Sequence, residues 1–389
     1  MNFAAVRRLM FQIHMWIGLI LGLLLAILGL SGSILVYDNA VLDMLAPVPQ
    51  AVAKGEPMSL DKIAEAARAA VGRGQVQIAL PRAPGEAFSV RVTQPRDGEG
   101  MRGERPAPEG QRAGSPARPQ AATQVFIDPA SGAVLGTRRA GLPPALAFVH
   151  RLHGNFLMGR EGRQFVGWLG VAMLALGVTG LMLWWPKRGQ WKYAFFVRRT
   201  ATGLRFHREL HAATGIWIFV VFMMVSFSGV VIAFPNVFGL GNQAGRPAFN
   251  LREGPQIAPG DGTAALSAEQ AAAMAQTALP NATPTGITLP SRPDRTIMVN
   301  MEARGAVGAT VYIDPWRGRI VATRDPSGSF MAWQRPLHQG SGLGVVWQAL
   351  VFLSGLVPAL FVITGVIMWL KKRKRHLPMS AALAEEAAG

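Results

Sequence analysis

Residues 211–234, "HAATGIWIFVVFMMVSFSGVVIAF", decide the class of fold. The run contains no Asp, Glu, Lys or Arg, and it is long enough to cross a hydrocarbon core about 30 Å thick. Its first residue is His211, which lies next to the charged stretch that includes Arg208. A membrane helix gains nothing from a histidine at its start, so this residue needs another explanation.

Three more runs have the same length and apolar character. We therefore predict four transmembrane helices, at residues 14–37, 163–185, 211–234 and 345–370. The first run is too long for the apolar part of a signal peptide, and no small-residue cleavage site follows it. The chain has no cysteine, which excludes disulfides, thiolate metal sites and covalently attached c-type haem.

Basic residues lie close to one set of helix ends. They occur in residues 1–13, 186–210 and 371–389, so these three segments are predicted to be cytoplasmic. Residues 38–145 and 235–336 are then expected on the outer side. Much of the net charge of +17 therefore comes from basic residues that flank the membrane helices and set their orientation. It indicates contact with membrane lipid and gives no support for a nucleic-acid partner.

The two halves of the chain repeat. The first and third runs share a histidine, a glycine four residues later and a Ser-Gly pair near the far end: His14, Gly18, Ser31 and Gly32 match His211, Gly215, Ser228 and Gly229. The second and fourth runs share a preceding histidine and a Thr-Gly pair 26 residues later: His153, Thr179 and Gly180 match His338, Thr364 and Gly365. We predict a 2+2 duplication with a pseudo-two-fold axis along the membrane normal.

The outer segments also match each other. Residues 125–138 and 311–324 both contain an Asp-Pro turn between strand-like stretches, which predicts a β-hairpin in each. Ser59 and Ser267 each precede an Ala-rich helical pattern. We expect two small α+β domains, at 38–145 and 235–336. Residues 95–122 break the symmetry and are interpreted as a mobile insertion, either a solvated loop or a basic docking arm.

The paired histidines indicate a metal site. His14 and His211 lie at the predicted cytoplasmic starts of their helices, and His153 and His338 lie just outside the others, in residues 146–162 and 337–344. Two imidazoles that face each other across a two-fold axis can bind one metal between them. Haem b fits best, because its iron takes two axial nitrogens and four helices can enclose a flat macrocycle. Two haem groups per chain are expected.

Neighbouring residues suit such a site. Gly18 and Gly215 lie one turn after their histidines and would leave room for a porphyrin, while Arg8 and Arg208, with other basic residues nearby, could bind its propionates. Alternatives remain open. His207 could replace or support His211, and His150 could do the same for His153. Histidines at helix starts can also be interfacial polar residues, and glycines in membrane helices can be packing sites. The Ser-Gly and Thr-Gly pairs are interpreted as packing sites.

The position of His153 raises a geometric question. It precedes the second apolar run by about ten residues, so an unbroken helix at 1.5 Å per residue would carry it about 15 Å beyond the membrane. Gly154, Gly159 and Gly162 allow a bend that returns it. The outer pair therefore depends on this bend.

Together these features resemble the PepSY-associated transmembrane family of bacterial inner-membrane proteins. The resemblance rests on "IHMWIGLILGLLLAILGLSG", "RELHAATGIW", "RLHGNFLMGREG", "PLHQGSGLG" and the two "DPxxG" hairpins, and it covers nearly the whole chain. It implies PepSY-like outer domains, haem-carrying electron transfer and, as in the ferric-siderophore reductases of the family, reduction of Fe(III) to Fe(II). Some members carry a fused flavin or nicotinamide domain. We find no sequence pattern for such a domain in these 389 residues, so we expect a separate cytoplasmic reductase or a membrane quinol as the electron donor.

Two other functions compete with this one. The outer domains could bind a peptide or protein, with the membrane part as anchor or sensor. A permease is the second rival, but the predicted helices lack the intramembrane charges that usually mark an ion pathway.

Overall fold

The chain divides into two compact units. Met1–Val41, Pro144–Gln243 and Phe330–Gly389 form a helical unit, and Leu42–Pro143 and Ala244–Ser329 form a unit built around a β-sheet. The computed structural model describes residues 3–53, 55–81, 85–94, 122–238, 249, 251, 253–260, 266–302, 307–325 and 327–386. The predicted insertion at 95–122 lies outside these residues, except for its last residue.

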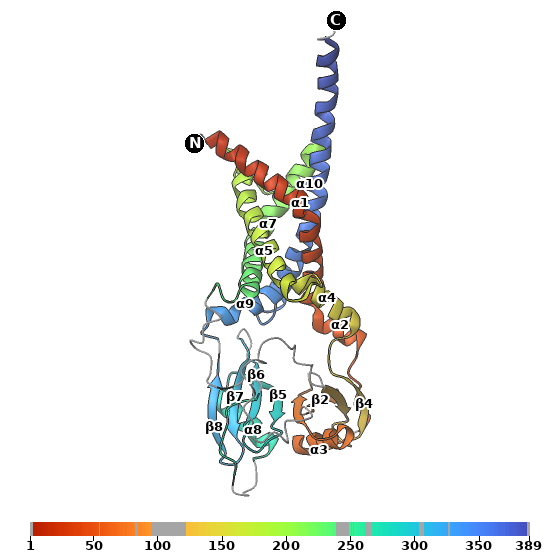
Figure 1. Cartoon of the computed structure of the whole chain (residues 1–389), viewed down its shortest axis with the longest axis vertical. Helices are drawn as coiled ribbons and strands as arrows, with labels where there is room; N and C mark the ends of the chain where they lie inside the picture. The colour runs from red at the N-terminus through yellow and green to blue at the C-terminus, as the bar shows by residue number, and fades with distance from the viewer. Residues whose placement is uncertain are drawn as a thin grey trace, which may run out of the picture. The chain divides into compact units, whose positions relative to one another are not determined.

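The helical unit contains the four predicted membrane helices. They are α1 (Phe3–Val36), α5 (Gly159–Trp184), α7 (Gly203–Ala233) and α10 (Val345–Glu386) (Figure 1). In the described part of the chain, each includes a segment long and apolar enough to span a membrane. Shorter helices complete the unit: α4 (Pro144–Asn155), α6 (Trp191–Ala194) and α9 (Phe330–Gln339), with α2 (Asp38–Leu45) following α1.

Three of the membrane helices begin earlier than their apolar runs predict, although α5 does so by only four residues. Helix α1 starts at Phe3 and α7 at Gly203, so His14 and His211 lie within their helices and not at the starts. Good helix formers precede both runs, namely Ala, Arg, Leu and Met before the first and Leu, Arg and Glu before the third, and they extend each helix beyond its apolar segment. In α7 an ion pair between Arg205 and Glu209, one turn apart, supports the extension.

The four long helices pack in a ring. Helix α1 contacts α5 and α10, and α7 contacts the same two helices, so α1 and α7 are diagonal to each other (Figure 1). Close packing of α1 on α10 depends on small residues. A Cβ atom at Gly29 would overlap the carbonyl oxygen of Gly355, and Ser33 Oγ donates a 2.8 Å hydrogen bond to the carbonyl of Phe352.

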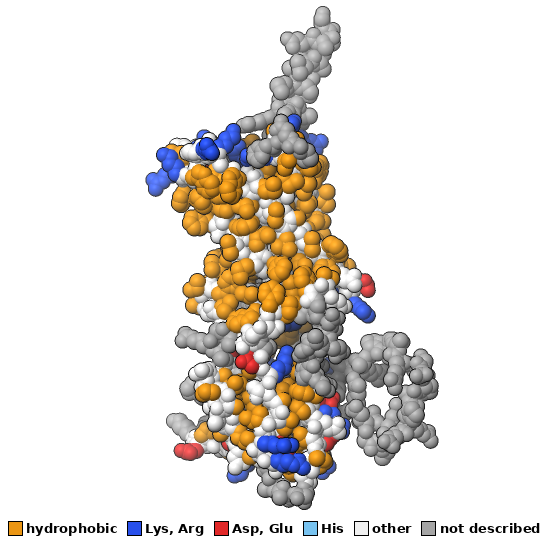
Figure 2. All heavy atoms as spheres, turned by 90° about the vertical axis from the view of Figure 1, so that its left-hand side faces the viewer, with side chains coloured by type: hydrophobic (Ala, Val, Ile, Leu, Met, Phe, Trp, Pro, Cys, Tyr) orange, Lys and Arg blue, Asp and Glu red, His pale blue; other side chains and the backbone are white. Residues whose placement is uncertain are grey.

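The surface of the helical unit agrees with a membrane location. Apolar side chains cover the bundle, and Lys and Arg side chains gather at the end where the N-terminus lies (Figure 2). We call this the basic end. Its cationic residues that line the cavity described below are Arg7, Arg8, Arg205, Arg208 and Lys372. The bundle therefore has one strongly cationic end, the pattern that the flanking residues predict.

The sheet unit corrects one prediction. The two outer segments do not form separate domains, because their strands join in a single eight-stranded sheet with the order β4-β3-β2-β1-β5-β6-β7-β8. The first segment supplies β1 (Gln75–Ala79), β2 (Phe88–Thr93), β3 (Ala122–Ile127) and β4 (Val134–Arg139); the second supplies β5 (Thr283–Leu289), β6 (Ile297–Glu302), β7 (Ala309–Asp314) and β8 (Arg319–Arg324). Antiparallel pairing of β1 with β5, in which Ile78 lies opposite Ile287, removes one exposed edge from each segment.

Two helices cover the core of this sheet. Helix α3 (Leu60–Val71) and helix α8 (Ala268–Ala278) contribute buried Ile and Ala side chains to a core shared with both halves of the sheet. The predicted N-caps are confirmed, since Ser59 and Ser267 each accept a hydrogen bond from the third residue of their helix. The carboxylate of Asp61 on α3 accepts a hydrogen bond from the backbone N–H of Ala268, and that of Glu269 on α8 accepts one from the backbone N–H of Leu60. Each helix therefore caps the N-terminus of the other.

Both predicted hairpins are present as well. Strands β3 and β4 pair through one turn, and β7 and β8 pair through the other. The buried aspartates Asp128 and Asp314 begin these turns and accept hydrogen bonds from backbone N–H groups within them.

Candidate functional site

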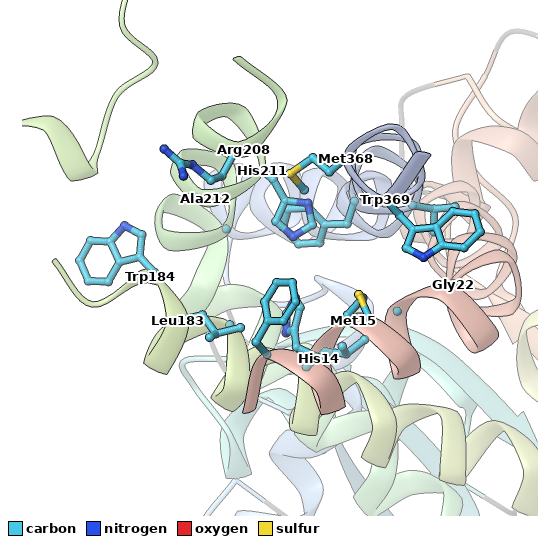
Figure 3. A pocket seen from close by; sticks show the side chains of 18 of the residues that line it. His14, Met15, Gly22, Leu183, Trp184, Arg208, His211, Ala212, Met368 and Trp369 are labelled. Carbon is cyan, nitrogen blue, oxygen red and sulfur yellow. The ribbon is translucent and has the colours of Figure 1, made fainter. Parts of the chain in front are cut away.

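Two histidines face each other inside the bundle, near its basic end. His14 comes from α1 and His211 from the diagonally opposite α7 (Figure 3). Their ring centroids are 6.1 Å apart. The sequence predicted that these residues face each other, and the helical unit brings them together.

The remaining two long helices supply a hydroxyl group to each ring. The Nδ1 atom of His14 lies 2.9 Å from Thr179 Oγ1 on α5. The Nδ1 atom of His211 lies 2.8 Å from Thr364 Oγ1 on α10. Because Nδ1 is engaged in both rings, the other nitrogen, Nε2, is the one left to bind a ligand.

A cavity of about 1240 Å³ adjoins this histidine pair. Both histidines line it, as do Gly18 and Gly215. A Cβ atom added at Gly18 would have no neighbour within 4 Å, and one at Gly215 would meet only the Phe361 ring, at 3.6 Å. The helix surface beside each histidine is therefore open, as clearance for a flat ligand requires.

The wall of this cavity also carries cationic side chains. Arg8 and Arg208, the two residues expected to bind propionates, both line it together with the other members of the basic end. Figure 3 places Arg208 on the helix that carries His211. Trp184 also lines the cavity and donates a 3.0 Å hydrogen bond to the carbonyl of Ala194.

A second histidine pair lies toward the other end of the bundle. His153 comes from α4 and His338 from α9, and their ring centroids are 5.9 Å apart. Each ring lies against a glycine of a long helix. A Cβ atom at Gly32 or Gly229 would lie 2.8 Å from Cε1 of His153 or His338, respectively.

Backbone carbonyl groups hold the second pair. The Nδ1 atom of His153 lies 3.0 Å from the carbonyl oxygen of Leu28, and that of His338 lies 2.9 Å from the carbonyl oxygen of Val225. Leu28 follows His14 by 14 residues on α1, which places the two pairs about 20 Å apart along the helix at 1.5 Å per residue.

Sharp turns return the second pair to the bundle, as the geometric argument requires. Between α4 and α5, Phe156 and Leu157 have positive φ angles of 46° and 63°, followed by Gly159 at 66°. Gly162 lets the chain fold back closely, since a Cβ atom there would overlap the carbonyl oxygen of Asn155. Of the three glycines expected to permit the bend, Gly154 lies within α4 and takes no part in the turn.

The matching turn in the second half uses glycine throughout. Gly340, Gly342 and Gly344 all have positive φ angles between α9 and α10. This is the conformation that glycine adopts without strain.

The remaining histidines do not join either pair. His207 packs against the ring of Phe206, with centroids 5.5 Å apart, and is not among the residues that line the cavity. His150 Nε2 lies 3.8 Å from Asp38 Oδ2. The side chain of His376 lies outside the part that the structure describes. The geometry therefore favours His211 over His207 and His153 over His150.

Sequence reasoning missed the hydroxyl groups that lie beside the histidine rings. The Thr-Gly and Ser-Gly pairs were interpreted as packing sites, but each hydroxyl lies close to a histidine of another helix. Ser31 Oγ is 3.4 Å from His153 Nδ1 and Ser228 Oγ is 3.3 Å from His338 Nδ1. The available signal was the exact repetition of these pairs at fixed distances from the histidines.

The ring separation of each histidine pair is compatible with an iron that has two axial imidazoles. Metal–imidazole nitrogen bonds of about 2 Å would place the two ring centroids about 6 Å apart, which matches both separations. The first pair also has the open space and the cationic groups that a haem with two propionates requires. In the described part of the chain, no cluster of three or more His, Asp or Glu residues suits a bare metal ion.

The four apolar helices, with histidines directed into the bundle, define a polytopic membrane protein. The family model described as "PepSY-associated TM region" matches residues 11–372. The chain therefore belongs to this family over nearly its whole length. No curated protein matches it.

Proposed function

We propose that this protein is an oxidoreductase that carries electrons across a bacterial inner membrane and reduces ferric siderophores on the outer side. The proposal rests on one observation above all. Two pairs of histidines, contributed by matching elements of the two halves, have ring separations of 6.1 Å and 5.9 Å. The repeated contacts also support descent from a 2+2 duplication, with the sheet unit formed by two PepSY-like segments.

The protein's own residues would hold and shield two cofactors. A haem b bound at each pair would supply an iron able to take up and release one electron. His14 and His211 would bind one iron, and His153 and His338 the other. Apolar helices surround both pairs, and such surroundings affect the reduction potential of a bound iron. Arg8 and Arg208 would bind propionates at the basic end.

The proposed orientation of the protein in the membrane follows from the positive charge at the basic end. The basic end is placed on the cytoplasmic side, together with both termini, and the sheet unit on the periplasmic side. The donor is then a separate cytoplasmic reductase or a membrane quinol. Each ferric siderophore would accept one electron, and its iron would become Fe(II), which such ligands bind far less tightly. No nucleophile or acid–base pair is required for this reaction.

The first test counts haem in the purified full-length protein. A pyridine-haemochrome assay should give two haem b per chain for the wild type. His14→Ala and His211→Ala should each lose the haem of the first pair, while His207→Ala should retain it. A wild-type protein without a Soret band, or a band unchanged in both alanine variants, would overturn the haem proposal and leave peptide binding as the better interpretation.

The second test addresses the substrate. The reduced wild-type protein is mixed with a ferric siderophore or with its gallium complex, which has a similar shape but accepts no electron. We expect reoxidation of the haem spectrum with the ferric complex only, and capture of Fe(II) by a ferrous chelator. If the reduced protein reacts with other oxidants but not with ferric siderophores, the substrate assignment is wrong.

A further inference from the structure

The acceptor atoms of the two histidine pairs differ in kind. At the first pair the Nδ1 partners are the side-chain hydroxyls of Thr179 and Thr364. At the second pair they are the backbone carbonyls of Leu28 and Val225. A mutation can remove a hydroxyl, whereas a backbone carbonyl is retained in any substitution. The two pairs should therefore respond differently to mutation.

The direction of the threonine hydrogen bonds can be deduced. Thr364 Oγ1 lies 2.8 Å from the carbonyl oxygen of Leu360, and Thr179 Oγ1 lies 2.7 Å from that of Ala175. A carbonyl oxygen only accepts, so the single hydroxyl proton of each threonine points to its own helix. The threonine oxygen can then only accept from histidine. In this arrangement Nδ1 carries the proton and Nε2 presents a lone pair.

We propose that Thr179 and Thr364 are the positioning residues of the first histidine pair, since each fixes the ring and the tautomer that leaves Nε2 free for iron. This inference rests on the proposed function. Hydrogen bonds of this kind orient metal-bound histidines and increase their basicity. Thr179 and Thr364 are the Nδ1 partners that the described residues show for His14 and His211.

The serines at the second pair provide a contrast. Ser31 and Ser228 occupy the positions near His153 and His338 that the threonines occupy near the first pair, but their oxygens are more distant, at 3.4 Å and 3.3 Å. Each hydroxyl donates to a carbonyl of its own helix. Because Leu28 and Val225 already accept the Nδ1 protons, removal of a serine hydroxyl leaves the tautomer fixed.

The test compares Thr364→Val with Ser228→Ala, and Thr364→Ser serves as the conservative variant. Thr364→Val should weaken haem binding at the first pair by about 10- to 100-fold, the usual effect of losing such a partner. Haem that remains there should have a higher reduction potential, because a less basic imidazole stabilises Fe(III) less well. Thr364→Ser should restore both properties, and Ser228→Ala should change neither.

The measurements are haem per chain at several haem concentrations and a spectroscopic redox titration of the full-length protein. One of the two titration steps should move to higher potential in Thr364→Val while the other stays in place. If the wild type binds haem and Thr364→Val matches it in affinity and both potentials, the positioning role is wrong. If the wild type binds no haem, the proposed function itself fails, so the two failures are distinguishable.

Discussion

Asp128 illustrates how one carboxylate can organise a hairpin of the sheet unit. Its Oδ1 atom accepts from the backbone N–H groups of Ala130 and Ser131, at 3.0 Å and 2.9 Å. Its Oδ2 atom accepts from Val52 and Ala53, at 2.6 Å and 3.0 Å. The N–H groups of Ala53 and Ser131 are the main reason that the pKa of Asp128 is held well below its ordinary value.

The lowered pKa of Asp128 predicts how the stability of this hairpin depends on pH. A lowered pKa in the folded state means that the carboxylate stabilises the hairpin fully above its unfolded value of about 3.9 and progressively less below it. Asp128→Asn should increase hydrogen exchange in β3 and β4 at neutral pH, and the loss of protection on acidification should become smaller. Exchange is measured by mass spectrometry on the full chain and corrected for intrinsic rates. The control is Glu65→Gln, which changes an exposed carboxylate on α3. If β3 and β4 are equally protected from exchange in both variants, Asp128 does not stabilise the hairpin.

The histidines could be predicted from the sequence, but their hydrogen-bond partners could not. Internal repetition relates His14 to His211 and implies that equivalent residues face each other across an axis. It does not reveal which side chain of a third helix touches the ring. Thr179 lies 165 residues from His14, and only the packing of α5 against α1 brings the two together. Repetition identifies equivalent residues, whereas packing determines neighbours.

At the scale of elements, α4 depends on a glycine of α1. A Cβ atom at Gly32 would lie 2.8 Å from His153 Cε1, which is closer than non-bonded carbon atoms approach. Gly32→Ala should therefore displace the ring and reduce haem from two per chain toward one. Gly154→Ala is the matched control beside the same histidine, because a Cβ atom there has no neighbour within 4 Å and alanine is the better helix former. Full haem content in Gly32→Ala would rule out this steric role.

The turn between α4 and α5 could be predicted only in part. Glycines suggested a bend near His153, but Phe156 and Leu157 carry two of the positive φ angles. Side chains of this size rarely adopt that conformation, so no sequence pattern announces it. The second half reaches the same result with three glycines, at positions 340, 342 and 344. Both turns return a histidine to the bundle. This shared role explains why they occur at equivalent positions of the two halves although their residues differ.

At the scale of the whole molecule, the sequence predicted strands better than it predicted their assembly. Asp-Pro turns between strand-like stretches located both hairpins. The pairing of β1 with β5 joins residues more than 200 positions apart, such as Ile78 and Ile287. Alternation is the same for a strand at an edge and a strand at such a junction, provided that one face is buried. The strand pattern gave no sign of this junction, so the prediction of two separate domains was wrong.

The direction of the chain across the membrane is the last property that the proposed function requires. Because the chain lacks cysteine, single cysteines can report it without removal of native thiols. Gln190 is exposed in the connection at the basic end, and Ala69 is exposed on α3 of the sheet unit. In intact spheroplasts, a membrane-impermeant maleimide should label Ala69→Cys almost completely and Gln190→Cys only after lysis. Labelling in the reverse order would place the basic end outside, and the electron would then have to enter from the periplasm.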